Sequence, residues 1–157
     1  MSSKMSSKPT AEQLARYAEQ FNDSLTMKHF GVRVRFPDAE HVEAILDPIQ
    51  PEQRGGLGSD AVNGGVLAAL FDLAIGCTPA LVDPTRKTAT VQLSMQFMRG
   101  VRGHKLLVRS QIDRVGGMLV FSSATVFDEK GTACAQCQGM ARMSEEKWQS
   151  GESPAVN

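Results

Sequence analysis

The stretch Asp60-Ala-Val-Asn-Gly-Gly-Val-Leu-Ala-Ala-Leu-Phe-Asp-Leu-Ala-Ile-Gly-Cys-Thr-Pro-Ala-Leu-Val-Asp-Pro84 decides the fold of this chain. Apolar residues occupy nearly every helical phase from Val66 to Cys77, which is typical of a helix that is buried on most sides. Asn63 is the expected N-cap of this helix. The only charged residue between Asp60 and Asp83 is Asp72. Because a carboxylate inside a buried helix is costly unless it is paired, hydrogen-bonded or protonated, we expect Asp72 to have a function.

The segments on either side of this helix predict one more helix and six strands. Thr10, with Gln13 three residues later, forms a capping-box pattern that begins a helix ending at about residues 22–26. Two short strands are predicted at 32–36 and 41–46, and a period of two predicts four more at 88–97, 105–115, 118–127 and 132–143. The turns between the last four are short, at 99–103, 116–117 and 128–131, which predicts an antiparallel meander. An apolar helix wrapped by a curved antiparallel sheet of about five to six strands gives an α+β fold.

Length and composition limit the class of protein. A chain of 157 residues predicts one domain. We place it at residues 10–144, after a disordered Ser/Lys-rich leader (1–9) and before a flexible tail (145–157). The formal net charge is zero, so no nucleic-acid or acidic-membrane partner is expected. We expect no apolar run to approach the roughly 18 residues of a membrane span. Three cysteines cannot all pair, which favours a reduced, cytoplasmic setting.

The motif Asn63-Gly64-Gly65, with Asp72 eight residues after Gly64, resembles one in a known family. The hotdog-fold acyl-CoA thioesterases of the phenylacetate-pathway type have His-Gly-Gly followed by Asp or Glu at this spacing. The segments 91–101 and 114–117 are similar to a strand with its turn and to a glycine-centred hairpin of the same family. The resemblance covers roughly residues 32–143 and implies the hotdog fold.

The resemblance also implies an activity, the hydrolysis of the thioester in an acyl-CoA or, less readily, in an acyl carrier protein. The backbone N–H of Gly64 would bind the thioester carbonyl oxygen, where the helix dipole favours negative charge. Asp72 would act as nucleophile or as general base toward water. Thr90 stands where some relatives position that water, although its alternation with Val91 predicts a solvated strand face.

Further residues are candidates for substrate binding. Gly65 is one of them, and Leu67, Phe71, Met95 and Phe97 would line an apolar pocket near Asp72. Arg99 and Arg102 could bind the phosphates of coenzyme A, or be solvated turn residues. No cofactor or metal is expected, and coenzyme A enters only as part of the substrate. On a strand, Cys134-x-x-Cys137 would send its two side chains to opposite faces, which disfavours a metal site.

The helix geometry predicts a homo-oligomer. Eight residues at about 1.5 Å each place Asp72 about 12 Å along the axis from Gly64. A hydrogen bond spans only about 3 Å, so one thioester cannot contact both residues of one chain. Gly64 of one subunit must then face Asp72 of another, in a dimer or a dimer of dimers.

Two departures from the family leave alternatives open. Asn63 replaces the histidine before the glycines and could be only an N-cap, and Leu57 replaces an amide residue seven positions before Gly64. The alternative function is therefore a non-catalytic acyl-CoA-binding or regulatory protein, in which Asp72 is structural. A hydratase is disfavoured because no histidine lies between His41 and His104.

Overall fold

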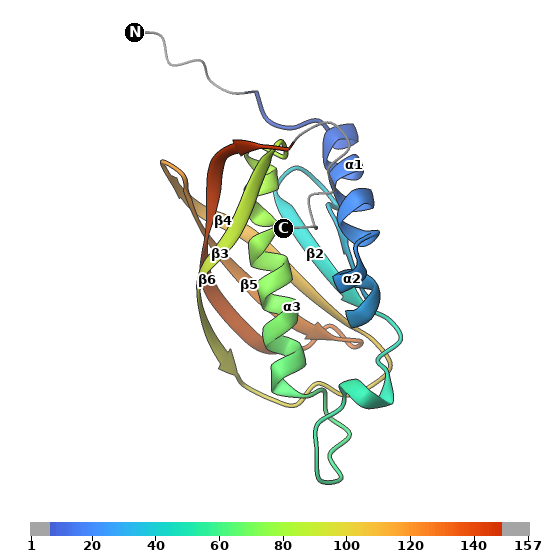
Figure 1. The fold of residues 1–157 in the computed structure, drawn as a ribbon. Helices are drawn as coiled ribbons and strands as arrows, with labels where there is room; N and C mark the ends of the chain where they lie inside the picture. Colours follow the sequence, from blue (N-terminus) through green and yellow to red (C-terminus); the bar gives the residue numbers. More distant parts are fainter. Residues whose placement is uncertain (1–6, 149–157) are drawn as a thin grey trace, which may run out of the picture.

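The computed structural model describes residues 7–148. The parts of the predicted leader and tail at 1–6 and 149–157 lie outside these described residues. The six antiparallel strands form a single curved sheet that wraps the helix α3 (Gly64–Gly76) (Figure 1). The strands are β1 (Val32–Arg35), β2 (His41–Leu46), β3 (Arg86–Phe97), β4 (Leu106–Gly116), β5 (Leu119–Asp128) and β6 (Ala133–Lys147). The predicted α+β hotdog architecture is confirmed.

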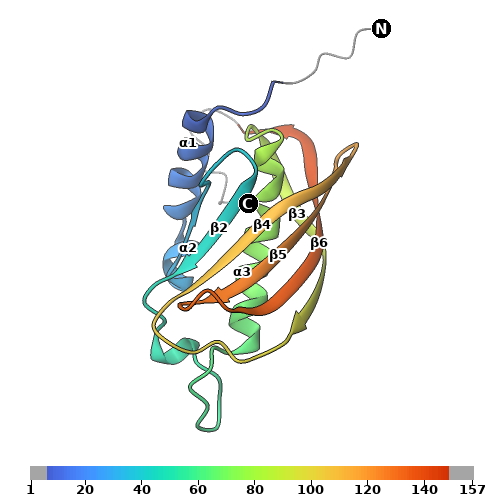
Figure 2. The same cartoon turned by 180° about the vertical axis from the view of Figure 1, so that it is seen from behind.

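The order of strands in the sheet is β1-β2-β4-β5-β6-β3, so the predicted four-strand meander is wrong for its first strand. β3 pairs with β6, with Leu93 opposite Gly139, while β4 pairs with β2. The segment between β3 and β4 is therefore a crossing connection and not a hairpin turn (Figure 2). Val101 in its middle is fully buried, and its carbonyl accepts a hydrogen bond from the N–H of Val62 at 2.9 Å. Local turn residues could not reveal this, because the anchor lies about forty residues away in the chain.

The central helix α3 (Gly64–Gly76) lies in the concavity of the sheet. One side packs on the sheet with the buried residues Leu67, Leu70, Phe71, Ala74 and Ile75. The opposite side is only partly covered, and Asp72 lies on it exposed to solvent. The other residues from Val66 to Cys77 are buried or half-buried, so the expectation of a helix buried on most sides holds except at Asp72. A short 3-10 helix, η2 (Thr78–Leu81), continues the buried stretch.

The segment Gly64–Leu81 has 18 residues and a mean hydropathy of 1.6, so by length and composition alone it could cross a membrane. This corrects the expectation that no run reaches that length. More than half of the segment is buried inside the folded domain. The apolar residues of this segment thus contribute to the core of the domain.

Two short helices precede the sheet. α1 (Ala11–Asn22) begins with the predicted capping box of Thr10 and Gln13. α2 (Leu25–Phe30), which the sequence analysis missed, is capped by Ser24, whose hydroxyl accepts a hydrogen bond from the N–H of Met27 at 3.3 Å. The loop before α3 contains a third short helix, the 3-10 helix η1 (Pro51–Gln53).

The two edges of the sheet differ. At the β1 edge, Asn22 of α1 donates from Nδ2 to the carbonyl of Val34 at 2.8 Å, and its Oδ1 accepts from the N–H of Val34 at 2.7 Å. The side-chain amide thus takes the place of a neighbouring strand's peptide group. The β3 edge is uncovered, and its large apolar residues Val91, Phe97 and the adjacent Met98 are 54%, 53% and 50% exposed. The two edges thus differ at these positions, since Val34 of β1 is paired with a side chain whereas β3 presents exposed apolar residues.

The last strand is longer than predicted. β6 continues to Lys147, which lies opposite Arg86, and the N–H of Trp148 donates to the carbonyl of Thr85 at 2.8 Å. Residues 145–147 therefore belong to the sheet and not to a loose tail. The polar composition after Ser144 arises because this end of β6 is largely solvent-exposed.

Candidate active site

Asp72 and Thr90 border the same pocket, with a volume of about 330 Å³, on the partly covered side of α3. Asp72 is exposed, so its charge needs no buried partner and the expected desolvation problem does not arise. The pocket lies between α3, β3 and the α1–α2 segment. Its lining residues are Phe21, Ser24, Thr26, Met27, Asp72, Leu73, Gly76, Thr88, Ala89 and Thr90.

Thr90 faces α3, contrary to its predicted place on a solvated strand face. The pairing of β3 with β6 shifts by one residue between Thr90 and Gln92, which is a β-bulge at Val91. A bulge adds a residue on one strand, so the alternation of faces is reversed across it. Thr90 thereby joins the helix-facing side of the strand together with Leu93. The residue pattern around Val91 did not predict this bulge.

The N-terminus of α3 carries the second predicted group. The side-chain Oδ1 of Asn63 accepts a hydrogen bond from the N–H of Gly65 at 2.8 Å, which confirms Asn63 as N-cap. The N–H of Gly64 donates to no acceptor among residues 7–148, and Gly64 is exposed. A free N–H at the positive end of a helix is a donor for an anionic oxygen. The N–H of Gly65 is not free, because it donates to the side chain of Asn63.

Gly64 does not border the Asp72 pocket, and the two lie about 12 Å apart along α3 at about 1.5 Å per residue. Gly64 lies instead beside Phe97, whose ring carbons would be 3.9 Å from a Cβ at Gly64. Each protomer therefore presents its carboxylate and its free N–H at two separate places on the same exposed side of α3.

The remaining predicted binding residues lie elsewhere. Leu67 and Phe71 are 3% and 0% exposed and pack in the core between α3 and the sheet, so the expectation that they line the Asp72 pocket is corrected. Helix phase explains this, because neither shares the face of Asp72. Arg102 is tied to Asp60 by an ion pair with Nε and Oδ1 2.8 Å apart. Arg99 is exposed and forms no ion pair within residues 7–148.

The α1–α2 segment is the part of the pocket that sequence reasoning missed. Phe21, Ser24 and Met27 form one of its walls. The available signal was Ser24 followed by a six-residue helix and Gly31, which adopts the left-handed conformation with φ of 68°. Helices this short carry too little periodicity to be recognised by the pattern of apolar residues.

The three cysteines are unpaired and buried. Burial, with a smaller contribution from the Asp72 charge, raises the pKa of the Cys77 thiol to about 12 despite a hydrogen bond with Tyr17. Cys134 and Cys137 are both buried, not split between two faces as expected, because the β5–β6 pairing is irregular beside them. Burial also raises the pKa of each of these two thiols. Within the described part of the chain, no group of three His, Cys, Asp or Glu residues could hold a metal.

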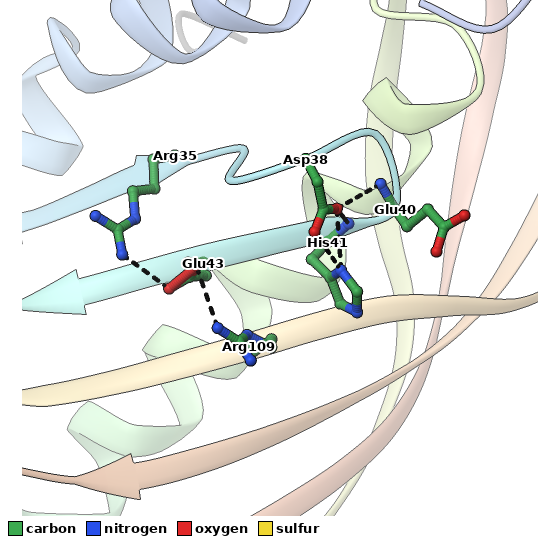
Figure 3. Close-up of polar contacts among 6 residues, drawn as sticks. All are labelled: Arg35, Asp38, Glu40, His41, Glu43 and Arg109. Carbon is green, nitrogen blue, oxygen red and sulfur yellow. Dashed lines mark hydrogen bonds and ion pairs between the residues drawn. The ribbon is translucent and has the colours of Figure 1, made fainter. Parts of the chain in front are cut away.

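A separate polar cluster lies on β1, β2 and β4, away from the Asp72 pocket (Figure 3). Glu43 is 1% exposed, and its two carboxylate oxygens contact the guanidinium groups of Arg35 at 3.1 Å and Arg109 at 3.5 Å. The three residues are direct neighbours across the strands. His41 forms a second contact with Asp38, with Nδ1 2.9 Å from Oδ2. The buried Glu43 carboxylate is thus paired with two arginines that are themselves at least half exposed.

Comparison with known proteins agrees with the fold. Residues 60–135 match the Thioesterase superfamily. A candidate esterase of Thermoplasma acidophilum is 25% identical over 80 residues, which is 51% of this chain and 61% of that protein. The chain thus spans about three fifths of that relative's length.

Solved structures of low sequence identity share the whole domain. A protein from Shewanella oneidensis related to the thioesterase superfamily is 23% identical, with a TM-score of 0.78 over 88% of this chain and 100% of that one. A thioesterase from Haemophilus influenzae is 16% identical, with a TM-score of 0.72 over 88% and 92%. The PaaI protein from the phenylacetic acid degradation operon of E. coli is 13% identical, with a TM-score of 0.75 over 88% and 99%. Residues 60–135 thus resemble the Thioesterase superfamily, and the described domain has the hotdog fold of these solved proteins.

Proposed function

We propose that this protein hydrolyses acyl-CoA thioesters to a free acid and coenzyme A. One observation carries the proposal: the exposed side of α3 offers a carboxylate, Asp72, in a pocket with Thr90, and a free backbone N–H at Gly64. Thioester hydrolysis requires both kinds of group, one to deliver a nucleophile and one to stabilise the oxyanion. The match of residues 60–135 to the Thioesterase superfamily supports the same reaction.

The proposed site is shared between two copies of the chain. Gly64 and Asp72 are too far apart along α3 to serve one carbonyl, so the Gly64 of one subunit would face the Asp72 of another. The uncovered β3 edge, with its exposed apolar residues, supports pairing of two copies along this strand. The active unit would be a homodimer, alone or within a dimer of dimers.

In the proposed mechanism, the Gly64 N–H donates a hydrogen bond to the thioester oxygen and stabilises the negative charge that develops there. Asp72 either attacks the carbonyl carbon itself or removes a proton from the attacking water. If Asp72 attacks, the C–S bond breaks to give an acyl–Asp72 anhydride, which one water molecule hydrolyses to the acid and free Asp72, with the water's proton going to the thiolate. If Asp72 acts as base, water adds to the carbonyl, the C–S bond breaks and the proton held by Asp72 passes to the leaving thiolate. No cofactor takes part in these steps.

Binding of the coenzyme A portion would fall to exposed basic residues. Arg99 is the better candidate, because it forms no ion pair among the described residues, whereas Arg102 is already paired with Asp60. Both could contact phosphate oxygens through the planar guanidinium. We place the protein in the cytoplasm, where acyl-CoA substrates and reduced cysteines would both be available.

The test is an assay of the purified protein with acyl-CoAs of varied chain length and aromaticity, following free thiol, beside Asp72→Asn. We expect turnover by the wild type and at least an approximately tenfold lower kcat in the variant, with binding retained. Asp113→Asn, at an exposed aspartate of β4 outside the pocket, is the matched control. Hydrolysis that is unaffected by Asp72→Asn would remove this residue from the mechanism, and a strictly monomeric active protein would contradict the shared site.

The alternative is a non-catalytic acyl-CoA-binding protein. It is favoured by one feature of the α3 N-terminus, where the Asn63 amide is committed to capping and cannot change protonation near neutral pH. Tight acyl-CoA binding without thiol release by the wild type would support this alternative over the thioesterase.

A further inference from the structure

The last residue of α3, Gly76, lies directly beneath the hydroxyl of Thr90. A Cβ at Gly76 would be 3.0 Å from Thr90 Oγ1, closer than ordinary van der Waals contact. Glycine is also a poor helix residue compared with alanine. The absence of a side chain at Gly76 therefore leaves the space that the Thr90 hydroxyl occupies.

β3 contacts this turn of α3 at two points. Thr88 Oγ1 donates to the carbonyl of Gly76 at 3.1 Å, and the bulge at Val91 directs Thr90 toward the same residue. The hydroxyl of Thr88 is thus used in holding strand and helix together. The hydroxyl of Thr90, by contrast, has no hydrogen-bond partner among residues 7–148 and borders the open pocket.

Asp72 precedes Gly76 by four residues, so both lie on one face of α3, about 6 Å apart along the axis. The carboxylate of Asp72, the backbone of Gly76 and the free hydroxyl of Thr90 all border the 330 Å³ pocket. A β-branched side chain such as threonine has few χ1 choices, so a methyl group at Gly76 would have to displace the hydroxyl or the strand.

We propose that Gly76 is a positioning residue, whose missing side chain sets the Thr90 hydroxyl beside the Asp72 carboxylate so that the two hold the same polar group in the pocket. The placement of Thr90 depends only on the packing of β3 on α3. Its consequence for the reaction rests on the thioesterase function proposed above, where the polar group is the attacking water.

The first arm of the test measures the Thr90 side chain without any reaction. The three-bond coupling between the Thr90 amide nitrogen and Cγ2 reports χ1 in solution NMR, and it is compared between the wild type and Gly76→Ala. We expect the coupling to change in Gly76→Ala and to stay the same in Gly116→Ala, where the added Cβ meets only ordinary contacts at 3.6 Å or more. An unchanged coupling in folded Gly76→Ala would overturn the inference.

The second arm is a double-mutant cycle on thiol release. Gly76→Ala should lower kcat by about three- to tenfold while KM stays within about twofold. A displaced Thr90 hydroxyl would orient the attacking water less well, but it would leave substrate binding unchanged. In a Thr90→Ala background, Gly76→Ala should change kcat by less than about twofold, since the residue it acts through is gone. Independent, multiplying effects of the two substitutions would show that Gly76 does not act through Thr90.

The two arms separate the two proposals. A wild type without turnover contradicts the thioesterase function, and the NMR arm then still decides whether Gly76 places Thr90. If the wild type has turnover and Gly76→Ala has an unaltered kcat, only the positioning role of Gly76 is contradicted.

Discussion

Replacing Asn22 with alanine removes two hydrogen bonds from β1, the strand at the closed edge of the sheet. Asn22 Nδ2 donates to the Val34 carbonyl at 2.8 Å, and Asn22 Oδ1 accepts from the Val34 N–H at 2.7 Å. Both bonds are partly buried, and Val34 itself is 1% exposed. Alanine keeps the helix propensity of α1 high, so the loss is confined to the strand edge.

The expected cost follows from these two bonds. A hydrogen bond contributes about 0.5–1.5 kcal/mol net, so losing both lowers the free energy of unfolding by about 2 kcal/mol and Tm by about 4–8 °C. The substitution also frees the N–H and carbonyl of Val34 to pair with another molecule. We therefore expect Asn22→Ala to form larger assemblies than the wild type at high protein concentration.

Thermal unfolding and light scattering after size exclusion measure the two effects. Glu19→Ala is the matched control, because Glu19 is an exposed residue of the same helix, one turn away. The reasoning is refuted if Asn22→Ala unfolds at the wild-type Tm and keeps the wild-type mass. A lower Tm at unchanged mass would refute the edge-blocking role alone.

Two further substitutions test polar contacts away from the pocket. Glu43→Gln removes the carboxylate that Arg35 and Arg109 contact from the strands on either side, and should lower the free energy of unfolding by about 1–2 kcal/mol, because both guanidiniums are at least half exposed. Urea unfolding in low and high salt checks this, because salt should reduce the difference in unfolding free energy between variant and wild type. An equal difference at both salt concentrations would exclude the loss of these ion pairs as its cause. Burial acts to raise the pKa of Asp83, but hydrogen bonds from Thr85 and Arg86 outweigh it and hold the pKa below its ordinary value of 3.8. A carboxyl group whose pKa is lowered by folding stabilises the fold at pH values above its unfolded pKa, and this stabilisation is lost as the pH falls through the folded pKa. Asp83→Asn should therefore lower the free energy of unfolding by about 0.5–1 kcal/mol at pH 7 and by progressively less below about pH 4. Unfolding measured across pH 2–7 contradicts the assignment if the difference does not shrink.

Local sequence determined the helices and strands wherever neighbouring residues decide the outcome. The capping box of Thr10 and Gln13 began α1, Asn63 capped α3, and local patterns and turn residues located all six strands to within a few residues. Fold class followed from these elements, because one long apolar helix must be wrapped by the sheet. α2 was missed because its six residues span fewer than two helical turns, which is too short for a recurring apolar pattern.

Tertiary structure alone decided how these elements meet. β3 lies beside β6, and the buried Val101 anchors the connection to β4, because pairing between strands distant in sequence leaves little trace in either one. The bulge at Val91 turned Thr90 from its expected solvated face toward α3, beside Gly76. The sequence singled out Asp72 and Gly64 by spacing, whereas the exposure of Asp72 depended on which side of α3 the sheet covers. Residue types and short spacings follow from local chemistry, but the faces they present follow from long-range packing.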